Sequence, residues 1–152
     1  MSVRVVVVDD QPLFRQAARE LLEHRGYVVV GEASGAVDAE EAVARLVPSA
    51  ALLDVRLGEA DGFEVARVLT RTHPTLAVLL ATADEAHAQR HALAAASGAR
   101  GIVLKSKLAA VDLTRFWPSP GPTGDHAERP SEAAWPDDAG RRSLALDDQG
   151  GT

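Results

Sequence analysis

The chain has 152 residues, 46% of them hydrophobic and only 4% aromatic, so aliphatic side chains must build its core. Its formal net charge of −6 argues against a nucleic-acid surface, which would need a basic patch. The chain contains no cysteine, which excludes disulfides and thiolate chemistry. It also contains no apolar run as long as a membrane span or the core of a signal peptide, so we expect a soluble cytoplasmic protein.

Apolar runs alternate with helix-like segments along the first part of the chain. In chain order, we predict a strand over residues 3–8, a helix over 11–25, a strand over 27–32, a helix over 36–46, a strand over 50–53, a helix that Asp61 caps and Pro74 ends, a strand over 76–81, a helix over 85–97, a strand over 100–104 and a short helix over 107–117. This alternation predicts an α/β fold with a parallel sheet covered on both faces, while periodicity alone leaves the strand order open.

The composition changes at Pro118. From there to Thr152 the chain carries five prolines and five glycines, and its acidic residues outnumber its basic ones. Such a segment cannot bury enough apolar surface to offset the entropy that is lost on ordering. We therefore predict one domain over residues 1–117 and a disordered acidic tail over residues 118–152.

Polar side chains directly follow four of the predicted strands. Asp9 and Asp10 follow the first strand, Asp54 the third, Thr82 the fourth and Lys105 the fifth. Because the carboxyl ends of parallel strands meet at one edge of a sheet, we expect these side chains to converge. Three carboxylates at one edge repel one another unless a cation lies between them, and hard oxygen ligands suit Mg²⁺. One carboxylate can then act as a nucleophile toward phosphorus, because the metal offsets the charge of an incoming phosphoryl group.

These side chains lie in the stretches VVVVDDQPLFR, LLDVRLGEADGFE, LLATAD and GARGIVLKS. In this order and spacing, the stretches resemble the receiver domain of bacterial two-component response regulators, over about residues 3–117. The resemblance implies a flavodoxin-like sheet of five parallel strands in the order 2-1-3-4-5, with five helices.

The resemblance also implies a role for each site residue. Asp54 would be the phosphoacceptor, attacking the phosphohistidine of a histidine kinase or a histidine phosphotransfer protein. Thr82 would donate a hydrogen bond to a phosphoryl oxygen. Lys105 would pair with Asp54 before phosphorylation and with the phosphoryl group after it. For Mg²⁺, Asp10 would be a direct ligand beside Asp54, Asp9 would help largely through water, and the backbone carbonyl of Arg56 would complete the protein ligands.

Plainer readings of the same residues stay open. Asp9 and Asp10 can cap the following helix, Thr82 can cap the helix after the fourth strand, and Lys105 can be an ordinary surface lysine. His87 and His91 share a face of the predicted helix over residues 85–97, but without a third metal ligand we expect them to be surface histidines.

Three positions depart from the pattern that the resemblance implies. Receivers usually carry Tyr or Phe three residues before the lysine, where this chain has Ile102. In the family this ring turns inward as the threonine moves toward the phosphoryl group, and Ile102 has no ring to signal phosphorylation in this way. Gly58 replaces the usual proline in the loop after the acceptor aspartate, which predicts a more flexible loop. Ser106 replaces the usual proline after the lysine, a variant familiar among receivers linked to helix-turn-helix domains.

A further hypothesis concerns the lifetime of the phosphorylated state. Arg56 lies two positions after the acceptor aspartate, and Asp84 lies two positions after the threonine. We expect these opposite charges to approach each other across the site and to screen the phosphoryl group from water. The alternative is that both side chains point to solvent.

We conclude from the sequence that the chain is a stand-alone phosphoacceptor receiver. Its output would come from protein contacts on the face made by the fourth helix, the fifth strand and the fifth helix, without direct contact to nucleic acid or membrane, and homodimerisation stays open. The first rival is a receiver-fold module that signals without phosphorylation. The second is a Mg²⁺-dependent phosphohydrolase with a covalent aspartate, although the DxD spacing and the substrate-binding cap of such enzymes are not evident. The third is a DNA-binding regulator, which the acidic charge disfavours.

Overall fold

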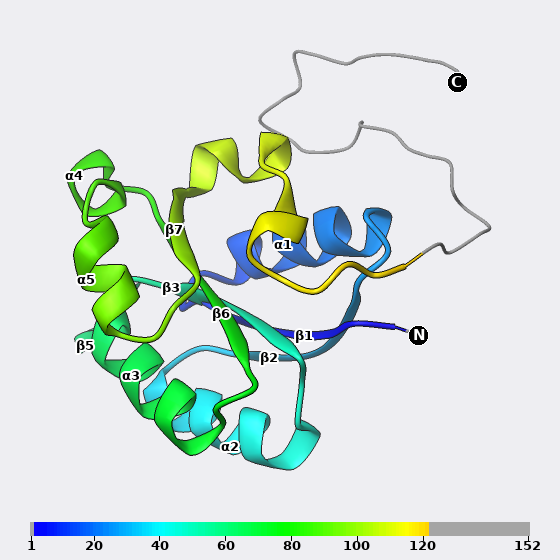
Figure 1. Cartoon of the computed structure of the whole chain (residues 1–152), viewed down its shortest axis with the longest axis horizontal. Helices are drawn as coiled ribbons and strands as arrows, with labels where there is room; N and C mark the ends of the chain where they lie inside the picture. Colours follow the sequence, from blue (N-terminus) through cyan, green and yellow to red (C-terminus); the bar gives the residue numbers. More distant parts are fainter. Residues whose placement is uncertain (1, 122–152) are drawn as a thin grey trace.

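A five-stranded parallel sheet forms the centre of the molecule (Figure 1). The structure is a computed structural model of the whole chain, and it describes residues 2–121. The strands of this sheet are β1 (Arg4–Val8), β2 (Val28–Ala33), β3 (Ala50–Asp54), β6 (Ala77–Thr82) and β7 (Gly101–Leu104). Their order is β2-β1-β3-β6-β7, and all neighbouring pairs are parallel. Counted along the chain, this is the order 2-1-3-4-5, so the flavodoxin-like arrangement is confirmed.

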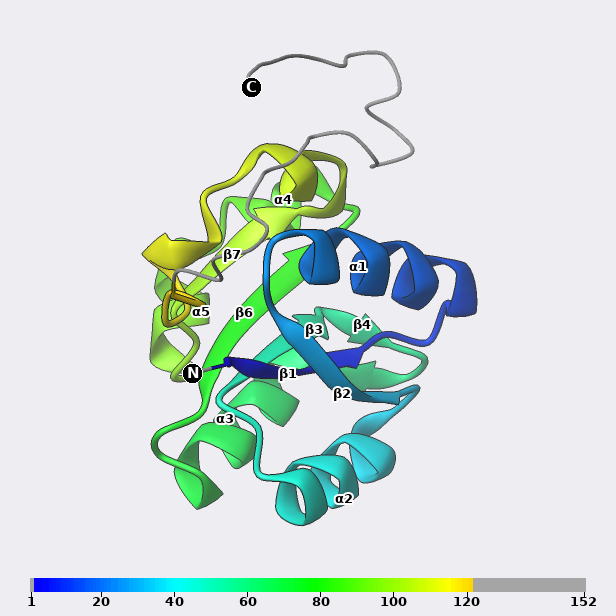
Figure 2. The same cartoon turned by 90° about the vertical axis from the view of Figure 1, so that its right-hand side faces the viewer.

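Helices cover both faces of the sheet, which accounts for the continuous apolar runs in its strands. The helices are α1 (Pro12–His24), α2 (Ala36–Leu46), α3 (Gly62–Thr72), α4 (Glu85–Ala88) and α5 (His91–Ala96), with 3-10 helices η1 (Lys105–Ala110) and η2 (Leu113–Arg115). Figure 2 shows α1 on one side of the sheet and α2 and α3 on the other. Alternate residues of one strand therefore belong to different cores: Val5 and Val7 pack toward α1, whereas Val6 and Val8 pack toward α2 and α3.

Local sequence explains where two of the helices begin or end. Proline occupies the first turn of α1, where its missing N–H removes no helical hydrogen bond. Gly26 follows that helix with φ +94°, a backbone conformation that other residues rarely adopt. The Asp61 carboxylate accepts a hydrogen bond from the Phe63 N–H at 2.9 Å, so the predicted N-cap of α3 is confirmed.

The predicted helix over residues 85–97 is wrong as a single helix. It is broken between α4 and α5, where Arg90 has φ −87° and ψ +58°, outside the helical region. The two pieces bury only one side chain between them, that of Ala94. Alanine-rich segments of this length need tertiary packing to stay helical, and here little packing is available to hold one continuous helix.

The predicted α-helix over residues 107–117 is also wrong, because the two 3-10 helices occupy this segment. The Arg25 guanidinium donates hydrogen bonds to the carbonyl oxygens of Ala109 and Val111, which a continuous α-helix would use internally. Further along, Trp117 is 2% exposed and packs edge-to-face against Tyr27 at 5.3 Å between ring centroids. Side-chain contacts to the connection between α1 and β2 therefore shape this segment more than helix propensity does.

The described residues continue a short way into the predicted tail. Residues 118–121 contain no helix or strand, and the rest of the predicted tail lies outside the described residues. In the described part of the chain, no helix is long and apolar enough to span a membrane.

Candidate functional site

Three carboxylates meet at the carboxyl edge of the sheet, as their positions in the sequence predict. Asp9 follows β1 and is 1% exposed, Asp54 ends β3 and is 7% exposed, and Asp10 is exposed to solvent. Each contributes a carboxylate oxygen, and these oxygens lie within 4.8 Å of one another. The arrangement concentrates negative charge in a partly buried place, which is unfavourable unless a cation compensates for it.

Backbone N–H groups orient two of these carboxylates. Asp9 Oδ1 accepts from the Gln11 N–H at 2.9 Å, just before α1 begins. The N-cap of α1 is Gln11 and no side chain caps this helix, so the plainer reading of Asp9 and Asp10 as caps is wrong. The other oxygen of Asp9, Oδ2, points to the site. Asp10 Oδ2 accepts from the Gly58 N–H at 3.1 Å, across to a hairpin of β4 (Arg56–Leu57) and β5 (Ala60–Asp61) that the sequence did not predict. Gly58 has φ +62°, which suits the turn of this hairpin.

Lys105 brings a positively charged ammonium group next to two of these carboxylates. Its Nζ lies 3.3 Å from Asp54 Oδ2, so the structure contains the pairing that the resemblance implied. A shorter contact of 2.7 Å joins the same Nζ to Asp9 Oδ2, which the sequence did not predict. The lysine side chain is only 13% exposed, so water screens these contacts weakly.

The electrostatic surroundings alter the acidity of Asp54. Burial and the negative charge of Asp9 raise the pKa of its carboxyl group from 3.8 to about 6, against the opposing effects of Lys105 and the Arg56 N–H. At neutral pH the group is therefore still ionised, but less stably than an exposed aspartate. An opposite charge brought to this site has more to gain than it would at the surface.

Thr82 ends β6 and is 3% exposed. Its Oγ1 accepts a hydrogen bond from the Asp84 N–H at 3.0 Å, so it fixes the backbone before α4, close to the plainer reading. The cap of α4 is Asp84 itself, whose carboxylate accepts from the Ala86 N–H and lies 3.6 Å from His87 Nδ1. The structure does not join Asp84 to Arg56: within residues 2–121 these two side chains form no ion pair.

The other residues singled out in the sequence lie apart from this site. Ile102 is 5% exposed and packs in the core on the α2 and α3 side of the sheet. His87 and His91 fall on separate helices, and within the described residues neither belongs to a group of potential metal ligands.

Sequence reasoning missed three residues that support the site. Arg15 Nη1 donates to the Asp9 carbonyl oxygen at 2.5 Å. The Phe14 ring lies 4.4 Å from Lys105 Nζ, measured to the ring centroid. A Cβ on Gly62 would lie 2.2 Å from the Asp54 carbonyl oxygen, so only glycine allows α3 to start so close to β3. The glycine after Asp61 was a usable signal, whereas the two α1 side chains looked like ordinary helix residues.

Comparisons with known proteins agree with this geometry. The family model "Response regulator receiver domain" matches residues 5–114. The probable transcriptional regulatory protein NarL of Mycobacterium tuberculosis (strain H37Rv) is 41% identical over 106 residues, which are 68% of this chain and 48% of that protein. The response regulator MprA of Mycobacterium ulcerans is 40% identical over 90 residues, 59% of this chain and 38% of that protein. The chain thus spans less than half the length of these curated relatives.

Solved structures show the same fold. The signal receiver domain of the putative response regulator NarL from Mycobacterium tuberculosis superposes with a TM-score of 0.61 at 37% identity, covering 75% of this chain and 89% of that one. A two-component response regulator of the LuxR family from Aurantimonas gives a TM-score of 0.63 at 32% identity, covering 70% and 76%. Together with the family model, which matches most of the described residues, these findings show that the chain belongs to the response regulator receiver domain family of two-component systems.

Proposed function

We propose that the protein is a response regulator that accepts a phosphoryl group on Asp54. The observation that carries the proposal is the arrangement around this side chain: a buried carboxylate lies beside a lysine and within reach of two further carboxylates. The proposed phosphodonor is the phosphohistidine of a histidine kinase or a histidine phosphotransfer protein, and we propose a cytoplasmic location, where such donors act. Histidine is a suitable donor because its imidazole is a stable leaving group once it is protonated.

The site fits a divalent cation. Asp9, Asp10 and Asp54 offer three hard oxygen ligands within 4.8 Å of one another, and Mg²⁺ is commonly bound through carboxylates together with phosphate oxygens. The Arg56 carbonyl is the further ligand that we assign, because this residue follows the acceptor by two positions and opens the β4–β5 hairpin. Bound Mg²⁺ would offset the negative charge of the phosphoryl group as it approaches the carboxylates.

Lys105 and Thr82 complete the proposed chemistry. The ammonium group, already 3.3 Å from Asp54, provides a positive charge for the phosphoryl oxygens. The Thr82 oxygen accepts from the Asp84 N–H, which leaves the hydroxyl proton free to be donated to a phosphoryl oxygen. Asp54 forms the bond to phosphorus while the bond to the donor breaks, and no protein group needs to change its protonation state.

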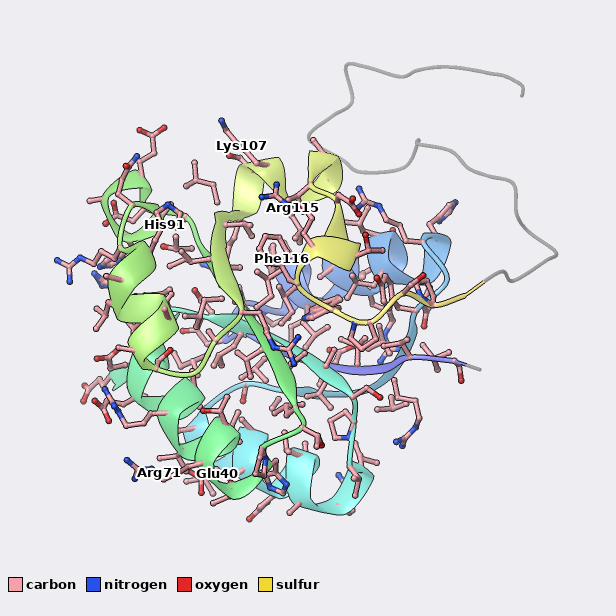
Figure 3. The ribbon with its side chains drawn as sticks, viewed as in Figure 1. Glu40, Arg71, His91, Lys107, Arg115 and Phe116 are labelled. Atoms are coloured by element: carbon pink, nitrogen blue, oxygen red, sulfur yellow. The ribbon has the colours of Figure 1, made fainter. Side chains whose placement is uncertain are left out.

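We infer that the surface through which the protein contacts its output partner lies on α4, α5, β7 and the 3-10 helices. These elements occupy the segments where the sequence predicted the fourth helix, the fifth strand and the fifth helix. Figure 3 shows His91, Lys107 and Arg115 on this side of the molecule, and all three side chains are exposed. From the start of α4 to the end of the 3-10 helices, the acidic residues are Glu85 and Asp112, against the basic residues Arg90, Arg100, Lys107 and Arg115 outside the site, although the chain as a whole carries a net charge of −6. This charge favours a partner protein with an acidic contact surface.

Two rivals make different predictions for one experiment, in which acetyl phosphate is added to the purified protein with Mg²⁺ or with EDTA. A phosphoacceptor should be labelled once per chain with Mg²⁺ and not with EDTA, and Asp54→Asn should remain unlabelled. A phosphohydrolase would instead consume many equivalents of phosphodonor per chain while little labelled protein accumulates. An interaction module that works without phosphorylation would show neither labelling nor turnover, and that result would overturn the proposal.

A further inference from the structure

An aromatic ring lies against the ammonium group of the site. Phe14 belongs to the first turn of α1, whereas Lys105 follows β7, and the distance from Nζ to the ring centroid is 4.4 Å. Cation–π attraction acts within about 6 Å and strengthens when the cation is desolvated. The lysine side chain is 13% exposed, so the ring faces a cation that is largely shielded from water.

This ring differs in kind from the other two partners of Lys105. Asp9 lies 2.7 Å and Asp54 3.3 Å from Nζ, and both are anionic groups of the proposed metal and phosphoryl site. Binding of a divalent cation and phosphorylation would each change the charge that these carboxylates present to the lysine. The ring is neutral and takes no part in either event, so its attraction for the ammonium group persists through both.

We propose that Phe14 is a positioning residue for Lys105. Its ring keeps the ammonium group at the site while the carboxylate partners change, so that the positive charge meets the phosphoryl group as it is transferred. The inference rests on the proposed function. In the transfer, an Asp54 oxygen forms a bond to phosphorus, the bond from phosphorus to the donor atom breaks, and the donor keeps the electron pair. Lys105 stays protonated throughout.

The test measures the rate at which acetyl phosphate labels Asp54 in the presence of Mg²⁺. Phe14→Leu keeps an apolar side chain but removes the π face, and we expect labelling to be about three- to tenfold slower. Phe14→Tyr keeps the π face and should label at close to the wild-type rate. Phenylalanines carrying one, two and three fluorine atoms at position 14 should slow labelling progressively, because fluorination weakens the negative ring face while changing its shape little. Equal rates across the fluorinated series would show a packing role only and would overturn the inference.

A double-mutant cycle identifies the group through which the ring acts. If Phe14 acts through Lys105, Phe14→Leu should change the rate less than about twofold in a Lys105→Met background. An equal loss in both backgrounds would contradict the inference. A second cycle uses urea unfolding in EDTA, where phosphorylation plays no part, and should also give coupled effects for the two positions. If the wild type is not labelled at all, the proposed function fails, whereas labelling without coupling removes only the role of Phe14.

Discussion

Replacing Asp54 by asparagine should stabilise the metal-free protein at neutral pH, although it removes the proposed phosphoacceptor. In the folded state, burial and the charge of Asp9 raise the pKa of this carboxyl group from 3.8 to about 6. The folded protein therefore binds the proton more tightly than the unfolded chain does. It follows that ionised Asp54 lowers the free energy of unfolding above pH 6, and that this loss is relieved as the pH falls through 6 toward 3.8.

The size of the effect follows from the two pKa values. At about 1.36 kcal/mol per pKa unit, the difference between 3.8 and about 6 corresponds to about 3 kcal/mol at pH 7.5. The amide in Asp54→Asn avoids this cost, in which the attraction of Lys105 for the carboxylate is already counted. The amide N–H groups lack hydrogen-bond acceptors placed for them, so we expect a net gain of about 1–3 kcal/mol. For a domain of this size that is about 4–12 °C in melting temperature.

The assay is thermal unfolding of the wild type and Asp54→Asn in EDTA, at low salt, from pH 7.5 to pH 4. The gap between the two proteins should be largest at pH 7.5 and should shrink steadily below pH 6. Glu32 titrates in the opposite sense: burial raises the pKa of its carboxyl group, but hydrogen bonds from Arg19 and Arg15 outweigh this and lower it. Its stabilising effect is lost as the pH falls, but both proteins carry it, so it cancels in the comparison.

Glu40→Gln is the matched control, because it removes one negative charge from an exposed position on α2. It should leave the melting temperature nearly unchanged at every pH. The reasoning is refuted if Asp54→Asn is no more stable than the wild type at pH 7.5 in EDTA. It is equally refuted if the gap persists unchanged at pH 4, because the gap would then not arise from the ionised carboxylate.

Three further outcomes are expected. Gly62→Ala should lower the free energy of unfolding by about 2 kcal/mol or more and slow the labelling of Asp54, because the new Cβ would lie 2.2 Å from a backbone oxygen. In the control variant Gly35→Ala the new Cβ meets nothing within 4 Å, so neither effect is expected. Urea unfolding and acetyl phosphate labelling check both variants. Arg25→Met should cost about 1–3 kcal/mol, because two backbone carbonyls of the C-terminal segment lose their charged donor, and a wild-type unfolding curve would contradict this. A chain that stops at residue 121 should melt and accept phosphate as the full chain does, and a strongly lowered melting temperature would show that the removed residues contribute to the fold.

The sheet could be predicted from the sequence because its strands carry an unambiguous signal. Runs such as residues 5–8 and 76–81 are apolar on both faces, which fits a strand covered on both sides. Each boundary of the five strands in this sheet was therefore predicted to within one residue, whereas the short β4–β5 hairpin was not predicted. The two wrong helices lack such a signal. Six of the 13 residues over 85–97 are alanines, which favour no particular buried face. The segment over residues 107–117 takes its shape from the distant Arg25.

The site was partly predictable for a similar reason. Asp9, Asp54 and Lys105 were predicted because each lies at the carboxyl end of an apolar strand, and parallel strands bring their carboxyl ends to one edge. The closer pairing of Lys105 with Asp9 could not be predicted, because it depends on side-chain geometry between strands far apart in the sequence. The contact between Phe14 and Lys105 could not be predicted for the same reason, and a phenylalanine in the first turn of an amphipathic helix is typical of a core residue.

The central claim is that Asp54 carries the phosphoryl group, and chemical mapping of the modified residue tests it most directly. The protein is labelled with acetyl phosphate and Mg²⁺, the acyl phosphate is reduced with borohydride, and the peptides are analysed by mass spectrometry. Reduction converts a phosphorylated aspartate to homoserine, which marks the position permanently. The account predicts homoserine at position 54 alone. Homoserine at position 9 or 10, or phosphate on a residue that borohydride does not reduce, would contradict it.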